Sequence, residues 1–361
     1  MAGAPDILFV TRKWAPAIGG METWSHRLSE SLATLAPVEV VALPGKGNGH
    51  PPGALALLAF PFTVLRRYLG RGRAPQVLQL GDMALWPLGL FALLRRGDTR
   101  IVLAAHGTDV SYPRRGGLKG RAYGAYLKLG ARLLGQAKVV ANSAATAAAA
   151  RQCGWRNTCV VPLATDMTGE VAESAPAPHL LFAGRLVERK GCGWFIRHVL
   201  PLLPEGLELH VAGTAIDPAE AAALDHPRVR FLGPLDQAEL ARAYRAATCV
   251  IVPNIEPANG EFEGFGLVAT EAAAAGGVVL AADCGGLPSA IVDGVTGILV
   301  PSGQPQAWCD KINDVLQWDR DRRRTFIAGA LARTAADFRW PRVAERMLAV
   351  YRGQDDFCAG H

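Results

Sequence analysis

Two glutamates flank a glycine-rich turn in the second half of the chain. Glu263 stands just before Gly264-Phe265-Gly266, and Glu271 follows about two helical turns later. A helix start offers free backbone N–H groups and a partial positive charge, which suits a phosphate that glycines allow to approach closely. The two carboxylates supply acceptors for hydroxyl groups on either side. The pattern predicts a sugar-nucleotide site; the alternative is an ordinary turn with two solvated glutamates.

The elements around this turn are expected to be a strand, a loop and a helix. Residues 248–253 form a short apolar run typical of a buried strand, and residues 254–264 hold Pro, Asn and Gly without an apolar period. Residues 265–276 are rich in alanine and close on a glycine, as a helix does.

Two cations follow another predicted strand, at residues 179–183. The next turn contains Gly184, Arg185 and Lys190. Cations that face a diphosphate would offset the charge that builds on a leaving group. A surface loop with one ion pair through Glu188 is the alternative.

Two further turns are expected to frame a base through backbone groups. They follow the strands predicted at residues 207–213 and 229–233, and they contain Gly213 and Leu235.

The first half of the chain has its own candidates at strand ends. Gly19 and Gly20 open a helical pattern after the strand predicted at residues 6–11, which is a phosphate-compatible corner. His106 ends the strand predicted at residues 100–106, on the ligand edge of an open parallel sheet. We expect Asp109 to orient His106 or to bind a sugar hydroxyl. A structural histidine and a plain flexible turn are the alternatives.

Length and charge predict two domains with different partners. The 361 residues suit two domains of ordinary size. Residues 1–165 contain 20 Lys and Arg against 7 Asp and Glu, whereas residues 166–361 contain 18 against 25. The charge changes sign at residues 165–178, a stretch without apolar period in which we place the hinge.

Two basic stretches mix cations with apolar residues, at residues 60–75 and 112–136. Both fit an anionic membrane surface, and the second is expected to be one amphipathic helix. A solvated face is the alternative. Nucleic acid is not an expected partner because no nucleic-acid-binding motif is present. The longest apolar stretches, at residues 54–65 and 83–94, are too short for a transmembrane helix, and no signal peptide is recognisable.

Neither the cysteines nor the aspartates predict a metal site. The seven cysteines include no Cys-x-x-Cys and no histidine at zinc spacing, so we expect reduced thiols that pack mostly in the core. The sequence Asp319-Arg320-Asp321 lies in a charge-dense helical segment and is interpreted as a solvated face.

Taken in order, these motifs resemble those of the GT-B glycosyltransferases of family 4, a large retaining group. The resemblance rests on Gly19-Gly20, on residues 106–109 and 184–191, and on the Glu-x7-Glu pattern of Glu263 and Glu271. It implies an α/β fold of two Rossmann-like domains with a cleft between them. The acceptor-binding domain would span residues 1–165 and the nucleotide-sugar-binding domain residues 170–338. Residues 339–361 would form a helix that crosses back to the first domain.

The resemblance also implies roles for individual residues. Arg185 and Lys190 would bind the donor diphosphate, Glu271 the ribose hydroxyls, and Glu263 the transferred sugar. The expected catalytic residues are His106, Arg185, Lys190 and Glu263. The expected donor-binding residues are Gly19, Gly20, Asp109, Gly184, Gly213, Leu235, Gly264, Phe265, Gly266, Leu267 and Glu271. No cofactor and no metal are expected.

The implied reaction is retaining transfer of a sugar from a nucleotide-sugar donor to a glycan, glycolipid or lipid-linked acceptor in cell-envelope polysaccharide or glycoconjugate synthesis. The expected location is the cytoplasm or the inner face of the plasma membrane. The alternatives are a non-catalytic sugar-nucleotide-binding partner of an assembly complex and a sugar-nucleotide epimerase or phosphorylase of the same architecture. A dehydrogenase is disfavoured because the first strand-to-helix loop lacks Gly-x-Gly-x-x-Gly.

Overall fold

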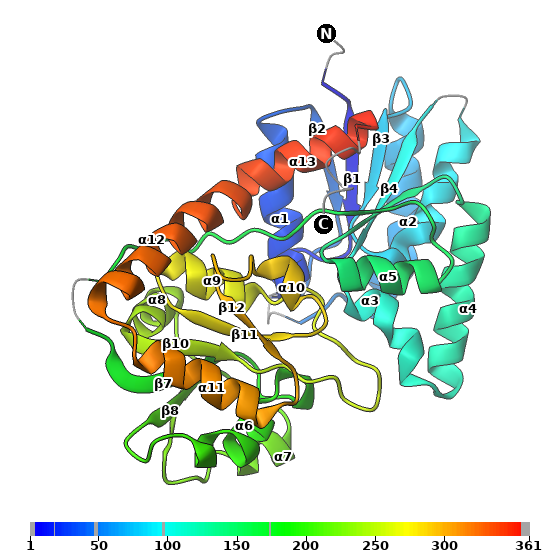
Figure 1. The fold of residues 1–361 in the computed structure, drawn as a ribbon. Helices are drawn as coiled ribbons and strands as arrows, with labels where there is room; N and C mark the ends of the chain where they lie inside the picture. The colour runs from blue at the N-terminus through cyan, green and yellow to red at the C-terminus, as the bar shows by residue number, and fades with distance from the viewer. Residues whose placement is uncertain (1–3, 18, 47–49, 96–97, 173–174, 355–361) are drawn as a thin grey trace. The chain divides into compact units, whose positions relative to one another are not determined.

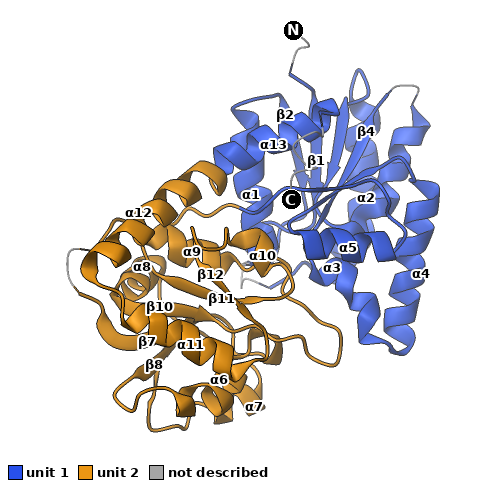
Figure 2. Ribbon diagram, in the orientation of Figure 1, with its two compact units in different colours: residues 1–163, 340–361 blue, residues 164–339 orange. Residues whose placement is uncertain are grey.

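The computed structural model describes residues 4–17, 19–46, 50–95, 98–172 and 175–354. The chain forms two compact units, one made of residues 1–163 and 340–361 and the other of residues 164–339 (Figure 2). Parts of two expected segments, the hinge at 165–178 and the final helix at 339–361, lie outside the described residues.

The first unit is built on a parallel six-stranded sheet with the order β2-β1-β3-β4-β5-β6 (Figure 1). Every residue of β1 is buried, which fits a strand with both faces covered by helices. The strands are β1 (Ile7–Thr11), β2 (Val38–Ala42), β3 (Val77–Leu80), β4 (Arg100–Ala105), β5 (Lys138–Ala141) and β6 (Thr158–Val160). The helices are α1 (Gly20–Ala33), α2 (Ala54–Gly70), η1 (Met83–Leu94), α3 (Thr108–Ser111), η2 (Tyr112–Arg115), α4 (Gly117–Leu133), α5 (Ala144–Gln152) and α13 (Trp340–Arg352).

The last of these helices, α13, completes the first unit although it follows the whole second unit in sequence. It packs against α1, and the buried Tyr351 hydroxyl donates a hydrogen bond of 2.9 Å to Oε1 of Gln79 in β3. Arg100 of β4 donates to the carbonyl oxygen of Val350 at 3.2 Å. The final helix is therefore part of the core of this unit.

The second unit repeats the plan with the strand order β12-β11-β10-β7-β8-β9, again all parallel (Figure 1). The strands are β7 (Ala177–Ala183), β8 (Glu208–Ala212), β9 (Val229–Gly233), β10 (Ala247–Val252), β11 (Val279–Asp283) and β12 (Ile298–Pro301). The helices are η3 (Glu188–Lys190), α6 (Cys192–His198), η4 (Leu200–Leu202), α7 (Pro218–Ala222), α8 (Gln237–Ala246), α9 (Leu267–Ala275), α10 (Leu287–Ala290), α11 (Pro305–Leu316) and α12 (Arg320–Asp337).

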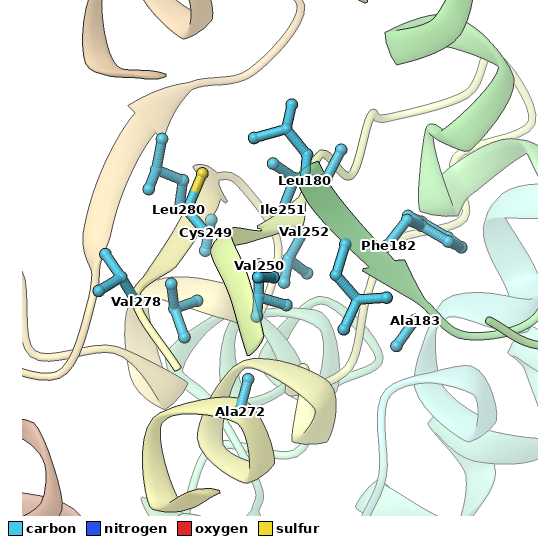
Figure 3. Packing of buried hydrophobic residues seen from close by; sticks show 14 of the residues in the cluster. Leu180, Phe182, Ala183, Cys249, Val250, Ile251, Val252, Ala272, Val278 and Leu280 are labelled. Atoms are coloured by element: carbon cyan, nitrogen blue, oxygen red, sulfur yellow. The ribbon is translucent and has the colours of Figure 1, made fainter. Parts of the chain in front are cut away.

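The core of this unit fixes the two strands whose ends are of functional interest. Leu180 and Phe182 of β7 lie beside Val250 of β10, and Ala272 of α9 packs on the same cluster (Figure 3). All four side chains are at most 1% exposed. The loops that leave β7 and β10 therefore start from well-packed strands.

The α/β fold with two parallel sheets is confirmed, but some local expectations are wrong. The helix expected at residues 112–136 is interrupted at Gly116, where φ is +71°, so that η2 and α4 are separate elements. Cys159 is disulfide-bonded, so the expectation of reduced thiols fails for this residue, whereas five other described cysteines are free. Within the described part of the chain, no helix combines the length and the apolar character that crossing a membrane requires.

Candidate active site

The topology of the second sheet marks the place where a ligand is expected. From β7 the chain first runs outward through β8 and β9, and it then returns to the other side through β10, β11 and β12. In open parallel sheets, ligands bind outside the carboxyl ends of the strands at such a switch point. The loops that follow β7 and β10 meet there, where Ile255 N–H donates to the carbonyl oxygen of Arg189 at 3.2 Å.

Lys190 and Glu263 form a close ion pair between these two loops. The Lys190 Nζ lies 2.6 Å from Oε2 of Glu263, and the two side chains are 12% and 13% exposed. The same oxygen accepts a hydrogen bond of 3.3 Å from Nδ2 of Asn254, which is buried. Burial acts to raise the pKa of Glu263, but Lys190, Arg189 and Asn254 together outweigh it, so the pKa lies below its ordinary value and the carboxylate is charged.

The start of α9 is shaped by close backbone contacts. Gly266 is its N-cap residue, with φ of +101°, and it provides no side-chain cap for the backbone N–H groups of the first turn. The N–H of Gly286 donates to the carbonyl oxygen of Glu263 at 2.7 Å. A Cβ at Gly286 would stand 2.2 Å from the carbonyl oxygen of Gly264. Backbone contacts thus hold an uncapped helix start next to the Lys190–Glu263 pair, an arrangement that can receive an anion.

Glu271 lies on α9, one turn beyond this start, in an environment that favours its neutral form. Burial raises the pKa of Glu271 to about 7, against a smaller lowering by Lys190. Near neutral pH the carboxyl group is therefore poised between its two protonation states.

Glu271 should make the protein less stable as the pH rises from about 4.5 to about 7. In this range the folded state binds the Glu271 proton more tightly than the unfolded state does, so stability falls with rising pH. In Glu271→Gln this contribution is absent. Urea unfolding at pH 5 and pH 8 should show a smaller loss of stability for Glu271→Gln than for the unmodified chain. Equal losses in the two proteins would contradict the raised pKa.

The other residues predicted for this unit differ in their surroundings. The N–H of Gly184 donates to Ala212 and that of Gly213 to Gly233, so the ends of β7, β8 and β9 are joined. Arg185 is exposed, and its side chain has no hydrogen bond or ion pair with the residues that the structure describes. Leu235 and Leu267 are partly exposed.

Phe265 contributes its side chain to the core and not to the surface. It is 2% exposed and lies 6.2 Å from the ring of Phe338. Any ligand contact of Phe265 would therefore be made by its backbone.

In the first unit, Asp109 holds the backbone around His106. Its Oδ1 accepts from the N–H of His106 at 2.9 Å, and its Oδ2 accepts from the N–H of Met83 at 3.3 Å. The imidazole Nε2 of His106 lies 2.9 Å from the carbonyl oxygen of Gly81, which requires the proton on that nitrogen. Asp109 therefore orients the strand end, while Gly81 orients the imidazole.

The glycine pair lies at the start of α1. The helix begins at Gly20, and its N-cap residue Gly19 provides no side-chain cap. The pair thus has the uncapped geometry expected of a phosphate-compatible corner.

Sequence reasoning did not identify Asn254, Arg12 and Asp82 as site residues. Asn254 directly extends the end of β10 and reaches Glu263, and Arg12 pairs with Asp82 beyond the ends of β1 and β3. Their positions just after predicted strands were a usable signal. Among the described residues, no three His, Cys, Asp or Glu side chains form a group suited to a metal ion.

Two parallel six-stranded sheets flanked by helices, each forming its own unit, define a two-domain α/β protein of the GT-B class. The family models agree with this architecture. Residues 177–317 match "Glycosyl transferases group 1", and residues 18–168 match "Glycosyltransferase Family 4". The chain belongs to the group 1 glycosyltransferases of family 4.

Curated relatives include two proteins named D-inositol 3-phosphate glycosyltransferase. The one from Corynebacterium diphtheriae is 36% identical over 185 residues, which are 48% of this chain and 42% of the relative. The one from Mycolicibacterium smegmatis is 42% identical over 135 residues, which are 37% of this chain and 29% of the relative. The chain thus matches less than half the length of these relatives.

Solved structures share the fold over almost the whole chain. The Anabaena HepE protein in complex with UDP matches with a TM-score of 0.72 and 20% identity, over 96% of this chain and 100% of that one. Sucrose-phosphate synthase from Thermosynechococcus elongatus matches with a TM-score of 0.73 and 21% identity, over 98% of this chain and 100% of that one. At these identities the likeness concerns the fold alone.

Proposed function

We propose that this chain transfers a sugar from a nucleotide-sugar donor to an acceptor hydroxyl with retention of the anomeric configuration. The observation on which the proposal depends is the Lys190–Glu263 pair of 2.6 Å, at the switch point of the second sheet and next to the uncapped start of α9. The cation and the helix start suit a diphosphate, and the carboxylate suits a sugar hydroxyl. Because the HepE structure holds UDP, a uridine diphosphate sugar is the first donor to test.

The proposed reaction takes place on one face of the sugar. The bond between the anomeric carbon and the phosphate oxygen breaks, and the bond to the acceptor oxygen forms on the same side. The acceptor proton passes to the departing phosphate, whose charge Lys190 and Arg185 offset. Glu271 would accept hydrogen bonds from the ribose hydroxyls, and His106 would touch the sugar. The proposal requires no metal, so activity should persist in the presence of EDTA.

Product stereochemistry and a donor panel test the proposal together. Thermal shift with uridine, adenosine and guanosine diphosphate sugars should give a rise in Tm with the true donor, because a ligand that binds the folded state stabilises it. NMR of the product formed from that donor should show the anomeric configuration of the donor. An inverted product would refute the proposed chemistry. Binding without turnover across an acceptor panel would favour a non-catalytic role.

We further propose that the first unit docks on an anionic membrane surface, where lipid-linked or envelope acceptors would be within reach. The first half of α2 is apolar and exposed: Leu55, Leu58 and Phe62 are 83%, 70% and 74% exposed. Arg66 and Arg67, also exposed, follow on the same helix. Exposed apolar side chains beside arginines suit the boundary between acyl chains and anionic headgroups. Docking would place the enzyme on the inner face of the plasma membrane.

Vesicle sedimentation tests this docking. At low salt the protein should sediment with vesicles that contain phosphatidylglycerol, and added salt should weaken binding through screening. The double variant Leu58→Ser, Phe62→Ser should bind clearly less. The control Ile216→Ser removes a residue of similar exposure, 55%, from the second unit. No sedimentation of the unmodified protein, or equal loss in the control, would refute the docking surface.

A further inference from the structure

The first sheet has a switch point of its own, with charged residues that the proposed donor site does not use. In the order β2-β1-β3-β4-β5-β6, the chain leaves β1 first toward β2 and then returns to the other side through β3. A ligand is therefore expected outside the carboxyl ends of β1 and β3. Arg12 directly follows β1, and Asp82 lies two residues beyond β3, so both stand at this point.

Arg12 is held in place by a buried carboxylate. Its Nε donates to Oδ2 of Asp82 at 2.8 Å, and the two side chains are 33% and 1% exposed. The other oxygen of Asp82 accepts from the N–H of Ala84 at 2.9 Å. The two terminal nitrogens of Arg12 have no hydrogen-bond partner among the described residues. The guanidinium is thus fixed through one nitrogen while its outer edge is left available.

Tyrosines of α4 lie close to the same segment. The Tyr126 hydroxyl donates to the carbonyl oxygen of Ala84 at 2.7 Å, and the ring of Tyr123 stacks on that of Tyr126 at 5.8 Å. The Tyr123 hydroxyl makes no hydrogen bond within the described part of the chain. Burial, together with the charges of Asp109 and Asp82, raises the pKa of Tyr123 above its ordinary value, so the hydroxyl keeps its proton.

The groups left available in this cluster are hydrogen-bond donors. Both oxygens of Asp82 and both of Asp109 already accept hydrogen bonds from Arg12 or from backbone N–H groups. What is left for a ligand is the outer edge of the Arg12 guanidinium and the protonated hydroxyl of Tyr123. A guanidinium edge matches the two oxygens of a phosphate or carboxylate better than it matches a lone hydroxyl.

We propose that Arg12 and Tyr123 form an acceptor subsite that binds an anionic group, a phosphate or a carboxylate, on the molecule that receives the sugar. This inference rests on the proposed function, because it concerns the acceptor of the same reaction. The anion would lie outside β1 and β3, beside the strand end that Asp109 holds through Met83 and His106. Acceptors without an anionic group would then be poor substrates.

The test measures anion binding while UDP occupies the proposed donor site. With UDP at saturation, isothermal titration compares glucose 6-phosphate with glucose, and vesicles of phosphatidylglycerol with vesicles of phosphatidylcholine. In the vesicle arm every protein also carries Leu58→Ser and Phe62→Ser, so that docking through α2 contributes little. The unmodified chain should bind one or both of the anionic probes. The two arms separate a soluble phosphate from a lipid headgroup, and Arg12-dependent binding in either arm supports the subsite.

Three variants distinguish the subsite from a structural role. Arg12→Ala should weaken anion binding at least tenfold, and Arg12→Lys should restore only part of it, because a lysine lacks the planar edge. Tyr123→Phe removes one hydroxyl and leaves the Arg12–Asp82 pair in place, so this variant should fold normally. It should still bind the anion, but severalfold more weakly than the unmodified chain does. UDP affinity should not change in any variant.

Anion binding that is equal in Arg12→Ala, Tyr123→Phe and the unmodified chain would overturn the subsite, and so would an absence of binding in both arms. Failure of the unmodified chain to bind UDP would instead count against the proposed donor site, while the comparison of anion binding between variants would still be readable.

Discussion

Replacing Lys190 by alanine should lower kcat by about 10²–10³-fold, the scale typical of losing one group that stabilises transition-state charge. Lys190 is a largely buried cation at the switch point of the second sheet, 2.6 Å from Glu263. Its loss would remove the positive charge that faces the departing phosphate. Among the described residues, the Glu263 carboxylate would then keep only the side-chain hydrogen bond from Asn254.

The measurement is steady-state kinetics with the donor that the thermal-shift panel identifies. Lys311→Ala is the matched control, because Lys311 is an exposed lysine on α11 in the same unit. The control should keep full activity. A Lys190→Ala enzyme in which both kcat and KM are nearly normal would reject the assigned role. A rise in KM with kcat unchanged would limit the role of Lys190 to donor binding.

Replacing Gly191 by alanine should cost several kcal/mol of folding free energy, beyond the roughly 1–2 kcal/mol of a left-handed backbone at a residue with a Cβ. Gly191 has φ of +69°, and a Cβ there would stand 1.9 Å from the carbonyl oxygen of Pro253. Pro253 directly follows β10, so relief of the clash must move the Lys190 loop away from the loop that holds Glu263. Stability and activity should therefore fall together.

Gly329→Ala provides the control for this substitution. Gly329 lies inside α12, and a Cβ there would meet nothing within 4 Å. Alanine at an exposed helix position gains up to about 1 kcal/mol over glycine, so this variant should be unchanged or slightly more stable. Urea unfolding of both variants gives the comparison. A Gly191→Ala protein as stable as Gly329→Ala would show that the two loops are not as tightly packed as described.

The sequence was informative about the fold because its signals are local. The strand predicted at residues 229–233 coincides with β9, and the apolar run at residues 248–253 differs from β10 by one residue at each end. Lys190 and Glu263 stood out because each lies between a predicted strand and a predicted helix.

The break at Gly116 was not predicted, although Pro113 and the pair Gly116-Gly117 are readable helix-breaking signals, because residues 112–136 were interpreted as one amphipathic helix. The helix α8 was also not anticipated, although its capping box of Asp236 and Glu239 is readable in the sequence.

The remaining site geometry depends on tertiary structure. Asn254 contacts Glu263 only because the loop after β10 folds back on itself. Arg12 and Asp82 are separated by 70 positions and meet only because β1 and β3 are neighbours in the sheet. No periodicity or spacing in the sequence specifies such a pairing, since it follows from strand order.

The place of α13 has a consequence for biosynthesis. A ribosome that has just released residue 163 from its exit tunnel has made all six strands of the first sheet but not the helix that supplies Tyr351 to Gln79. The surface of α1 on which α13 packs must then stay uncovered until the 176 residues 164–339, which precede α13, have been translated. The first-made half of the protein is thus the last to be finished, and nascent chains stalled within the second half would be natural clients of a chaperone.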